Sequence, residues 1–600
     1  MSHDPLQILS ERFLDAMRGA FGDRLPEGAD PMIAASRNPQ FGDYQSNAAM
    51  PLAKALGMKP RDIAAQIVEK LDLSGVAEPV DEHTIAGPGF INIRLDRGAL
   101  AGLLDALDSP DLGIEPPESP STIVVDLCGV NLAKQMHVGH LRSTVIGDTI
   151  ARVFERLGHR VIRQNHLGDW GLPIAMVTRA VMDRAAKGEI DLDAIDLDEL
   201  DALYKSAQKS CDPESAGEAA AENLARAKTT LVALQSGDAE TVAAWKRISD
   251  ITVNECVAVC ARLHATVLPE HTAGESTYRD ELAGIVDDLL SRGVAEESRG
   301  AVIVDLKDAG IAEPLLVRKS DGGFLYATTD MAAIRRRVQK FGGDRIIYAV
   351  DARQSLHFRQ LFAAAKKAGY AKRPDGTDAQ LDHAAFGTVL GEDNRPFKTR
   401  TGENVKLADL LDQAVERAGA AVKEKNPDLS PEDQRIVAEA VGIGAIKYTD
   451  LANDRVRDYV FSFDRMLAFE GNTGPYLQYA LVRIRSILRK AKAEHGVDEA
   501  ALGGDGAMLR IEAPEEKDLA LLILRFPGVV RTVADSLEPH RLCGYLYEVS
   551  TAFSGFFQNC PVLRAQDDVM RLSRLRLCRL TGRVLESGLE TLGIVALDRM

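Results

Sequence analysis

The sequence predicts an α/β protein built on a doubly wound parallel sheet, with a smaller α/β domain before the sheet and an α-helical bundle after it. A strand, loop and helix pattern runs over residues 121–148, and a second strand pattern follows at 159–165. Residues 1–110 mix both periodicities, whereas from residue 406 onward the pattern is almost wholly helical. At 600 residues the chain is long enough for several domains with large cores.

The first unit is predicted to contain helices and one clear strand. The helices are expected near Pro5–Phe21, Ser46–Leu56 and Pro60–Leu71, and the strand at Gly89–Leu95. Residues 108–120 are rich in Pro, Asp and Ser, which is typical of a linker. We therefore expect domains at 1–110, 120–405 and 406–600.

The loop between the strand at Thr122–Leu127 and the helix that begins near Val138 is the expected centre of the chemistry. It ends in His137-Val138-Gly139-His140, where backbone N–H groups and two imidazoles at a helix start suit an anion such as a triphosphate. Gly139 has no Cβ, so a flat base or ribose could pack on the backbone. In a parallel sheet this loop and residues 166–171, after the second strand, would line one crevice.

Residues 180–295 are acidic and helical, as expected of an insertion between two halves of the sheet. The second half begins with a predicted hairpin, in which strands at 315–319 and 324–327 flank a turn at 321–323. A helix then opens near Thr328. If it starts early, Tyr326 and Asp330 lie one turn apart and offer a ring and a carboxylate to a guanidinium.

Composition limits the class of protein. Net charge is −17, so a nucleic-acid partner would have to bind local basic clusters, which occur at 335–337, 483–492 and 571–583. The start of the chain does not look like a leader, and no apolar run approaches the length of a membrane span, so a cytoplasmic protein is expected. Seven irregularly spaced cysteines indicate a reducing compartment. Cys256, Cys260 and His264 recur every four residues, which is read as one buried helix face, and no metal site is predicted.

The flanks of the histidine motif carry a resemblance. Asn131-Leu132-Ala133-Lys134 before it and Leu141-Arg142-Ser143-Thr144 after it make a stretch that resembles the nucleotide-binding signature of class I aminoacyl-tRNA synthetases, specifically the bacterial arginyl enzymes. Residues 166–171, 326–331, 386–402, 453–463 and 471–480 resemble further motifs of that family in its order, as does the ending at 592–600. Residues 41–47 and 87–92 resemble its N-terminal domain.

The resemblance implies a Rossmann-like catalytic domain that attaches L-arginine to tRNA(Arg) through an arginyl-adenylate, with ATP and Mg2+ as cofactors and tRNA needed for activation. The family is mostly monomeric, and no protein-bound structural metal is expected in this chain. The implied catalytic residues are His137, His140, Lys398 and Lys134, and the implied ATP-binding residues are His137, Gly139, His140, Gln354 and Lys398. Arginine would be bound by Asp126, Asn131, Tyr326, Asp330 and Gln354, and tRNA by Gln45, Asn47, Tyr476 and Met600, with Tyr479 as a further candidate.

The sequence departs from the family pattern at two places, and two other classes of protein remain as alternatives. Gly129-Val130 replaces the family's usual Ser-Pro, which puts one hydroxyl contact in doubt. The second signature, around Lys398, lacks its usual second lysine, whose role Lys134 would take. The rivals are another class I synthetase, such as the cysteinyl type with its zinc-bound substrate thiol, and a catalytically silent paralogue that only binds tRNA.

Overall fold

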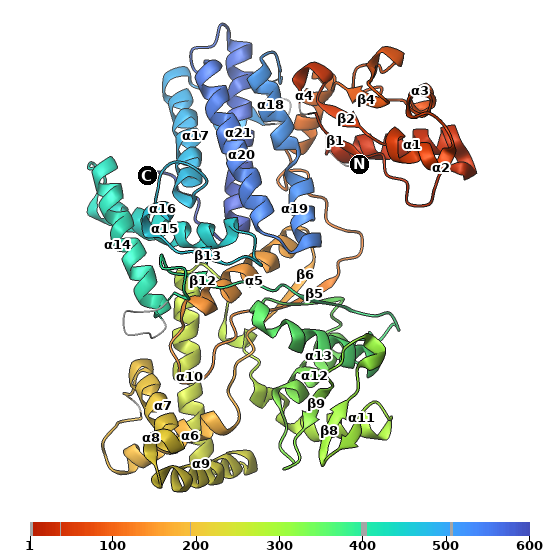
Figure 1. Cartoon of the computed structure of the whole chain (residues 1–600). Coiled ribbons are helices and arrows are strands. Elements are labelled where there is room, and N and C mark those ends of the chain that lie inside the picture. Colours follow the sequence, from red (N-terminus) through yellow and green to blue (C-terminus); the bar gives the residue numbers. More distant parts are fainter. Residues whose placement is uncertain (1–3, 37, 193, 398–404, 504–507) are drawn as a thin grey trace.

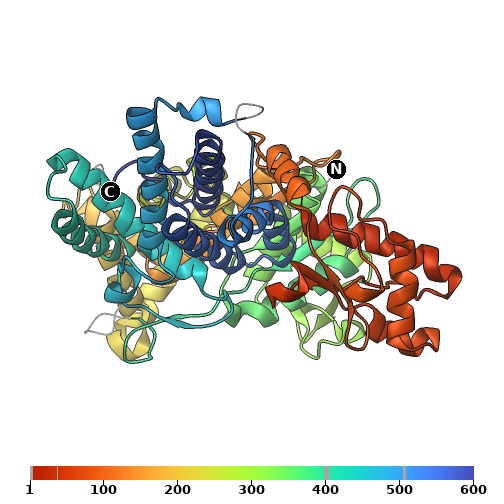
Figure 2. The ribbon, with the colours of Figure 1, turned by 90° about the horizontal axis from the view of Figure 1, so that it is seen from above.

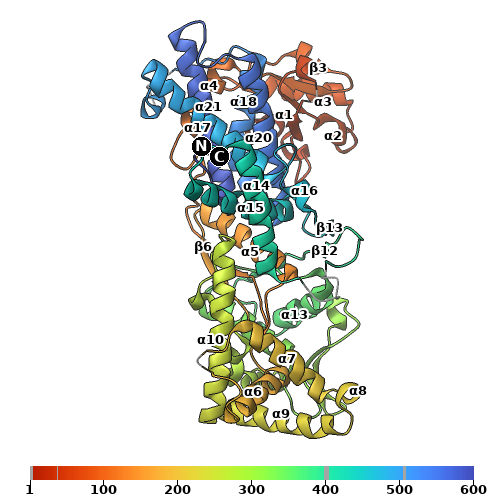
Figure 3. The same ribbon diagram turned by 90° about the vertical axis from the view of Figure 1, so that its left-hand side faces the viewer.

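The computed structural model describes the whole chain except residues 1–3, 37, 193, 398–404 and 504–507. The molecule is elongated, and the parallel sheet lies near its middle (Figure 1). The N-terminal domain lies beside the C-terminal helices at one end, and Figure 2 shows it to one side of them. The helical insertion forms the opposite end, as Figure 3 also shows.

The N-terminal domain is a four-stranded antiparallel sheet with helices against it. The sheet order is β1-β2-β4-β3. Its helix α1 starts where predicted because Asp4 caps it, accepting a hydrogen bond from the Leu6 N–H at 2.9 Å, and Pro5 needs no partner at the first position. The elements are α1 (Pro5–Phe21), β1 (Ile33–Ala35), β2 (Tyr44–Ser46), α2 (Ala49–Leu56), α3 (Pro60–Lys70), β3 (Ile85–Ala86), β4 (Phe90–Ile93) and α4 (Arg97–Leu107).

The central sheet is parallel, as predicted, with strand order β11-β10-β5-β6. Val124 in the first of its strands pairs with Ile162 on one side and Ile346 on the other. Because β5 and β10 are both interior strands, they are apolar on both faces. The elements are β5 (Thr122–Asp126), α5 (Val138–Arg156), β6 (Arg160–Gln164), β10 (Arg345–Tyr348), α13 (Ser355–Lys367) and β11 (Gln380–His383).

Two lobes separate the halves of this sheet. The first is the predicted helical insertion, with α6 (Leu172–Ala186), α7 (Leu197–Cys211), α8 (Pro213–Ala216), α9 (Ala219–Ser236) and α10 (Ala239–Arg262). The second contains α11 (Leu282–Ser291), β7 (Glu296–Ser298), β8 (Ala301–Val304), β9 (Leu315–Arg318) and α12 (Tyr326–Arg335), followed by a π-helical turn over Arg336–Lys340. In the second lobe β7, β8 and β9 form an antiparallel sheet.

The prediction of a hairpin at 315–327 is correct for its first strand and wrong for its second. Its first strand is β9, but the return is a single bridge between Arg318 and Phe324, and Tyr326 already opens α12. Thr328 explains the early start, because its hydroxyl bonds the Val317 carbonyl and so ties the helix to the strand. The helix therefore starts early enough to place Tyr326 and Asp330 one turn apart.

The C-terminal part is helical, as predicted, apart from the short strand β13, which pairs with β12. None of the helices in the described part of the chain is both long and apolar enough to cross a membrane. The elements are β12 (Val389–Leu390), α14 (Leu407–Lys425), α15 (Pro431–Ala452), β13 (Tyr459–Val460), α16 (Phe463–Met466), α17 (Gly474–His495), α18 (Pro514–Leu524), α19 (Phe526–Ser536), α20 (His540–Asn559) and α21 (Asp568–Thr591).

The basic clusters at 335–337 and 571–583 lie against acidic side chains. The side chain of Asp108, at the start of the predicted linker, is 1% exposed and pairs with Arg576, Arg579 and Arg583 of α21. The basic cluster of α21 therefore fastens the N-terminal domain to the helices rather than forming an open phosphate-binding face. The cluster at 335–337 is also internally paired, through Glu281 and Asp126.

Candidate active site

Two loops at the carboxyl edge of the sheet are bonded to each other through their backbones. The Leu132 N–H donates to the Gly168 carbonyl at 3.2 Å, and the Gly168 N–H donates to the Val130 carbonyl at 3.0 Å. Gly168 is required here because a Cβ would collide with the Asn131 side chain. The loops after β5 and β6 therefore lie side by side, as expected for neighbouring parallel strands.

The histidine pair is held by the first turn of α5. His137 is the N-cap, and its Nδ1 accepts a hydrogen bond from the Gly139 N–H at 3.0 Å. The Nδ1 of His140 accepts from the His137 N–H at 3.1 Å, and the two ring centroids are 4.0 Å apart. A Cβ at Gly139 would lie 2.8 Å from Cε1 of His137, so this glycine makes room for the imidazole.

These hydrogen bonds determine what the pair can offer a ligand. Burial lowers the pKa of His137 and lowers the pKa of His140 to about 3, so both rings are neutral at pH 7. Because each Nδ1 accepts a backbone N–H, the hydrogen bonds assign the single ring proton to Nε2. The pair therefore presents Nε2–H donors. The backbone N–H groups of His137 and Gly139, which were expected to face an anion, are already occupied by the rings.

The expected guanidinium site has an acid flanked by rings. Asp330 Oδ2 lies 2.7 Å from Nε2 of His357, and its Oδ1 lies 3.9 Å from Nε2 of His166. Tyr326 is one helical turn earlier, is 61% exposed, and has its ring centroid 4.9 Å from that of His357. A carboxylate beside an open aromatic face is a suitable arrangement for a guanidinium.

Asp126 is placed differently from the expectation. Its Oδ2 lies 2.6 Å from Nη2 of Arg337, whose side chain is completely buried and lies over the Tyr348 ring. The Asp126 charge holds the pKa of Arg337 above its ordinary value despite the burial. Asp126 therefore neutralises a buried cation, and any substrate nitrogen would share its carboxylate with Arg337.

Sequence reasoning missed one acid near the pocket. Burial, with the charges of Asp169 and Asp330 as further causes, raises the pKa of Glu275 to about 7. Asp169 positions this segment by accepting hydrogen bonds from the N–H and hydroxyl of Ser276 at 2.8 and 2.6 Å. No local pattern marks Glu275, because the acids that surround it come from distant segments. The other two expected arginine-binding residues are exposed: Asn131 lies in the loop after β5, and Gln354 ends a 3-10 turn directly before α13.

Comparison with known proteins decides the family. Residues 108–463 match the model described as tRNA synthetases class I (R), catalytic domain. The chain belongs to the class I arginyl-tRNA synthetases. Residues 7–95 match the arginyl tRNA synthetase N-terminal domain, and residues 477–600 match the DALR anticodon binding domain.

Relatives and solved structures agree with this membership. An arginine–tRNA ligase of Cellvibrio japonicus is 44% identical over 99% of both chains. The solved arginyl-tRNA synthetase of Plasmodium falciparum has a TM-score of 0.82 at 27% identity and covers all of both chains. The Thermus thermophilus arginyl-tRNA synthetase has a TM-score of 0.80 at 26% identity, with 99% of this chain and 100% of that chain covered.

Of the two catalytic lysines expected from the family resemblance, the structure describes Lys134 but not Lys398. Lys398 lies outside the described residues. The Nζ of Lys134 lies 4.4 Å from the centroid of the Tyr204 ring on α7, so this lysine points towards the insertion. After residue 404 the chain pairs with the histidine loop, through a bridge between Lys406 and His137 and a 2.8 Å hydrogen bond from Leu407 N–H to the Met136 carbonyl.

The expected tRNA-binding residues fall in two different domains, the N-terminal domain and the C-terminal helical bundle. In the N-terminal domain Gln45 on β2 donates to Oδ1 of Asn92 on β4 at 2.8 Å, and Asn47 follows β2 with its Oδ1 buried. Near the C-terminus, Tyr479 and Met600 line one pocket of about 410 Å³ together with Lys425, Asn426 and Phe469. Tyr476 instead packs 5.7 Å from the Tyr547 ring, which separates it from that pocket.

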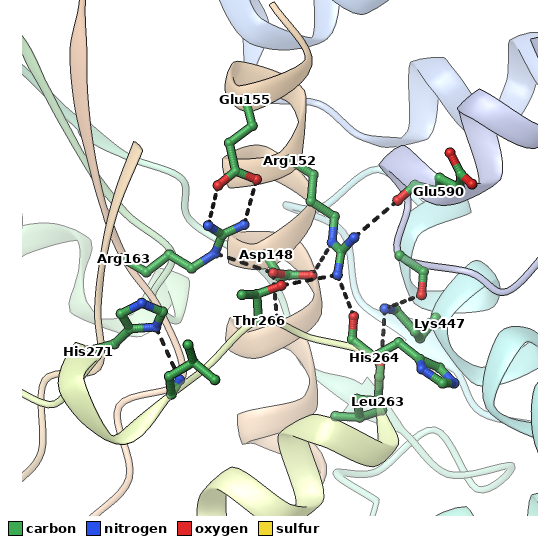
Figure 4. A network of polar contacts seen from close by, with 12 residues as sticks. Asp148, Arg152, Glu155, Arg163, Leu263, His264, Thr266, His271, Lys447 and Glu590 are labelled. Atoms are coloured by element: carbon green, nitrogen blue, oxygen red, sulfur yellow. Dashed lines mark hydrogen bonds and ion pairs between the residues drawn. The ribbon is translucent and has the colours of Figure 1, made fainter. Parts of the chain in front are cut away.

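A polar network joins helix α5 to the C-terminal helices (Figure 4). Arg152 on α5 donates to Asp148 at 2.7 Å and to the His264 carbonyl at 2.7 Å. Lys447 on α15 donates to the carbonyls of Leu263 and Gly593, each at 2.6 Å. Since α5 starts at the histidine pair, this network connects the helix that carries the pair to the helical bundle.

Lys447 makes the stability of the protein depend on pH. Complete burial lowers its pKa to about 7, whereas in the unfolded chain it is about 10.4. Between these two pKa values the unfolded state binds one more proton than the folded state. The contribution of this lysine to the free energy of unfolding therefore rises with pH. We expect the free energy of unfolding of the wild type, relative to Lys447→Met, to increase by about 2 kcal/mol from pH 7 to pH 9.

Urea unfolding at several pH values measures this effect. Lys423→Met is the matched control, because Lys423 is an exposed lysine of α14 and should give no pH-dependent difference. A difference between wild type and Lys447→Met that stays constant from pH 7 to pH 9 would contradict the burial of this amine.

Proposed function

We propose that this arginyl-tRNA synthetase couples L-arginine to tRNA(Arg) in two steps at the crevice between the loops after β5 and β6. Arginine carboxylate attacks the α-phosphorus of ATP and pyrophosphate leaves. The terminal 2′-hydroxyl of the tRNA then takes the arginyl group from the adenylate. The arrangement of Tyr326, Asp330 and the histidine pair at one sheet edge is the observation that carries the proposal.

The residues act by position and charge, with no covalent enzyme intermediate. The Nε2–H groups of His137 and His140 donate to phosphate oxygens as negative charge builds on them. Lys398 and Lys134 add positive charge beside the leaving pyrophosphate. Mg2+ carried by the ATP phosphates would neutralise part of their negative charge.

Arginine is selected by its side chain. The guanidinium lies against Asp330 with the Tyr326 ring beside it, and Glu275 ionises when that cation arrives, because the charge offsets the burial and the neighbouring acids. Asn131 and Gln354 hold the α-amino end and the adenosine. Lysine cannot fill this site equally, because its ammonium lacks the planar fork.

The tRNA contacts both the N-terminal domain and the C-terminal bundle. Gln45 and Asn47 contact its elbow from the domain at 1–110, and the bundle at 406–600 takes the anticodon beside Met600. Tyr479 rather than Tyr476 faces this task, because Tyr479 is 49% exposed and lines the pocket that contains Met600. The protein works in the cytoplasm as a monomer.

Replacing Tyr479 tests the anticodon pocket. A base stacked on an aromatic ring contributes about 1–3 kcal/mol, so Tyr479→Ala is expected to lower kcat/KM for tRNA by about 10- to 100-fold. Tyr479→Phe keeps the ring and should remain within a factor of about three of the wild type. Steady-state charging with tRNA as the varied substrate measures both, and an unchanged Tyr479→Ala would remove this residue from the pocket.

A charging assay tests the activity itself. Bulk tRNA is incubated with ATP, Mg2+ and each labelled amino acid in turn, and acid-precipitable label is measured. Label from arginine alone is expected. Label from cysteine or another amino acid would contradict the proposal in favour of a different synthetase, and no label with any amino acid would favour a silent paralogue.

A further inference from the structure

Three buried cysteines from distant parts of the chain converge behind the histidine loop. Cys128 lies in the loop after β5, and Cys256 and Cys260 lie one turn apart on α10. Cys128 Sγ is 3.4 Å from Cys256 Sγ and 4.0 Å from Cys260 Sγ, and all three sulfurs lie within 4.8 Å of one another. His264, which shares the sequence spacing, lies beyond the end of α10 in the network of Figure 4.

These separations match thiolates that share one ion. Zn2+ binds cysteine sulfur at about 2.3 Å, so two thiolates of a tetrahedral site are about 3.8 Å apart. The two measured distances bracket this value. A disulfide would need two sulfurs at about 2.05 Å and would leave the third thiol unused.

The surroundings of the sulfurs are polar rather than purely apolar. Asn165 Nδ2 lies 3.9 Å from Cys256 Sγ, and Asn165 Oδ1 accepts the Gly129 N–H at 3.1 Å. Thr144 lies beside Cys128, and its hydroxyl is buried next to the Cys128 thiol. Donors of this kind stabilise thiolates around a metal and orient them.

The backbone at Cys128 also indicates a ligand. Its φ is 71°, in the left-handed region that costs energy for a residue with a Cβ, and the neighbouring Gly129 has a φ of 68°. Such conformations persist where the surroundings hold a side chain in a required place. In this conformation Cys128 brings its thiol to the two thiols of α10.

We propose that Cys128, Cys256 and Cys260 form a three-thiolate site for a thiophilic divalent cation, with Zn2+ as its natural occupant. A water molecule or the hydroxyl of Thr144 completes the coordination. The ion fastens the loop between Asp126 and Asn131 to α10, and so joins the pocket to the insertion. The proposed ion site does not depend on the proposed function, because ion binding can be measured without the aminoacylation reaction.

Metal analysis of the full-length chain tests the site. The protein is reduced with a phosphine, stripped with EDTA, given excess Zn2+ and desalted. About one tightly held zinc ion per chain is expected in the wild type and in Cys543→Ser, a buried cysteine outside the cluster, and none in Cys256→Ser. Zn2+ should raise the unfolding temperature of the first two proteins only. Equal zinc in Cys256→Ser, or none in the reduced wild type, would overturn the proposal.

X-ray absorption of the wild type gives a test that needs no variant to fold. About three sulfur ligands at about 2.3 Å from zinc are expected, and Cd2+ in place of Zn2+ should give an ultraviolet thiolate-to-metal charge-transfer band. A shell of nitrogen and oxygen would show surface binding and contradict the site. A Cys128–Cys256 disulfide that forms in air, in a protein that binds no zinc when reduced, would assign the cluster to redox chemistry instead.

Discussion

Asp330→Ala is expected to lower kcat/KM for arginine in adenylate formation by about 100- to 1,000-fold. Removing one partner of a desolvated charge pair costs about 2–5 kcal/mol, and the Asp330 side chain is only 19% exposed between His166 and His357. Pyrophosphate exchange with arginine as the varied substrate, in the presence of tRNA, measures this loss. Affinity for tRNA should stay within a factor of about two, because the anticodon and elbow sites are remote.

Asp321→Ala is the matched control for this experiment. Asp321 is an exposed acid in the turn before α12, and its Oδ1 accepts only the local Gly323 N–H. Its removal should leave arginine activation close to that of the wild type. Unchanged activation in Asp330→Ala would exclude this carboxylate from the pocket, and equal losses in both variants would indicate a general effect on the lobe.

Asp126→Asn is expected to destabilise the protein by about 3–5 kcal/mol. Arg337 is completely buried, and Asp126 is the carboxylate that neutralises it, so the variant leaves an uncompensated charge in the core. Chemical unfolding followed by fluorescence measures the change. A loss below about 1 kcal/mol would contradict the structural role of this pair.

The double variant Asp126→Asn with Arg337→Met separates the two roles of Asp126. It removes both charges and keeps an unbranched apolar stem, so most of the stability should return. Arginine KM should nevertheless stay at least about tenfold above that of the wild type if Asp126 also contacts the substrate. Recovery of both stability and KM would show that Asp126 serves only Arg337.

Local patterns predicted the parts of the site that lie within one segment. The apolar run before His137 and the helical spacing after it located the strand, the loop and α5. The parallel sheet then followed from the strand at 159–165, and with it the shared crevice of the two loops. Tyr326 and Asp330 were found because their four-residue spacing has a meaning on a helix. The hairpin failed at Phe324 because Thr328 bonds back to β9 and starts the helix early.

Pairings between distant segments could not be predicted. Asp126 meets Arg337, and Asp108 meets three arginines of α21, although no periodicity relates these residues. The same holds for Cys128, which lies beside two cysteines of α10 although the sequence separates them by more than 120 residues. Each contact depends on how whole elements pack. The charge or thiol of one partner does not reveal the contact, because the same side chain could equally lie exposed on the surface.

Pyrophosphate exchange into ATP, run with each amino acid and with or without tRNA that accepts arginine, is the sharpest test of arginine activation by this chain. We expect exchange with arginine alone, and only when tRNA is present, as the family resemblance implies. Exchange driven by a different amino acid would contradict the assignment of the Asp330 pocket to a guanidinium. Absence of exchange under every condition, in a protein that still binds tRNA, would contradict catalysis by this chain.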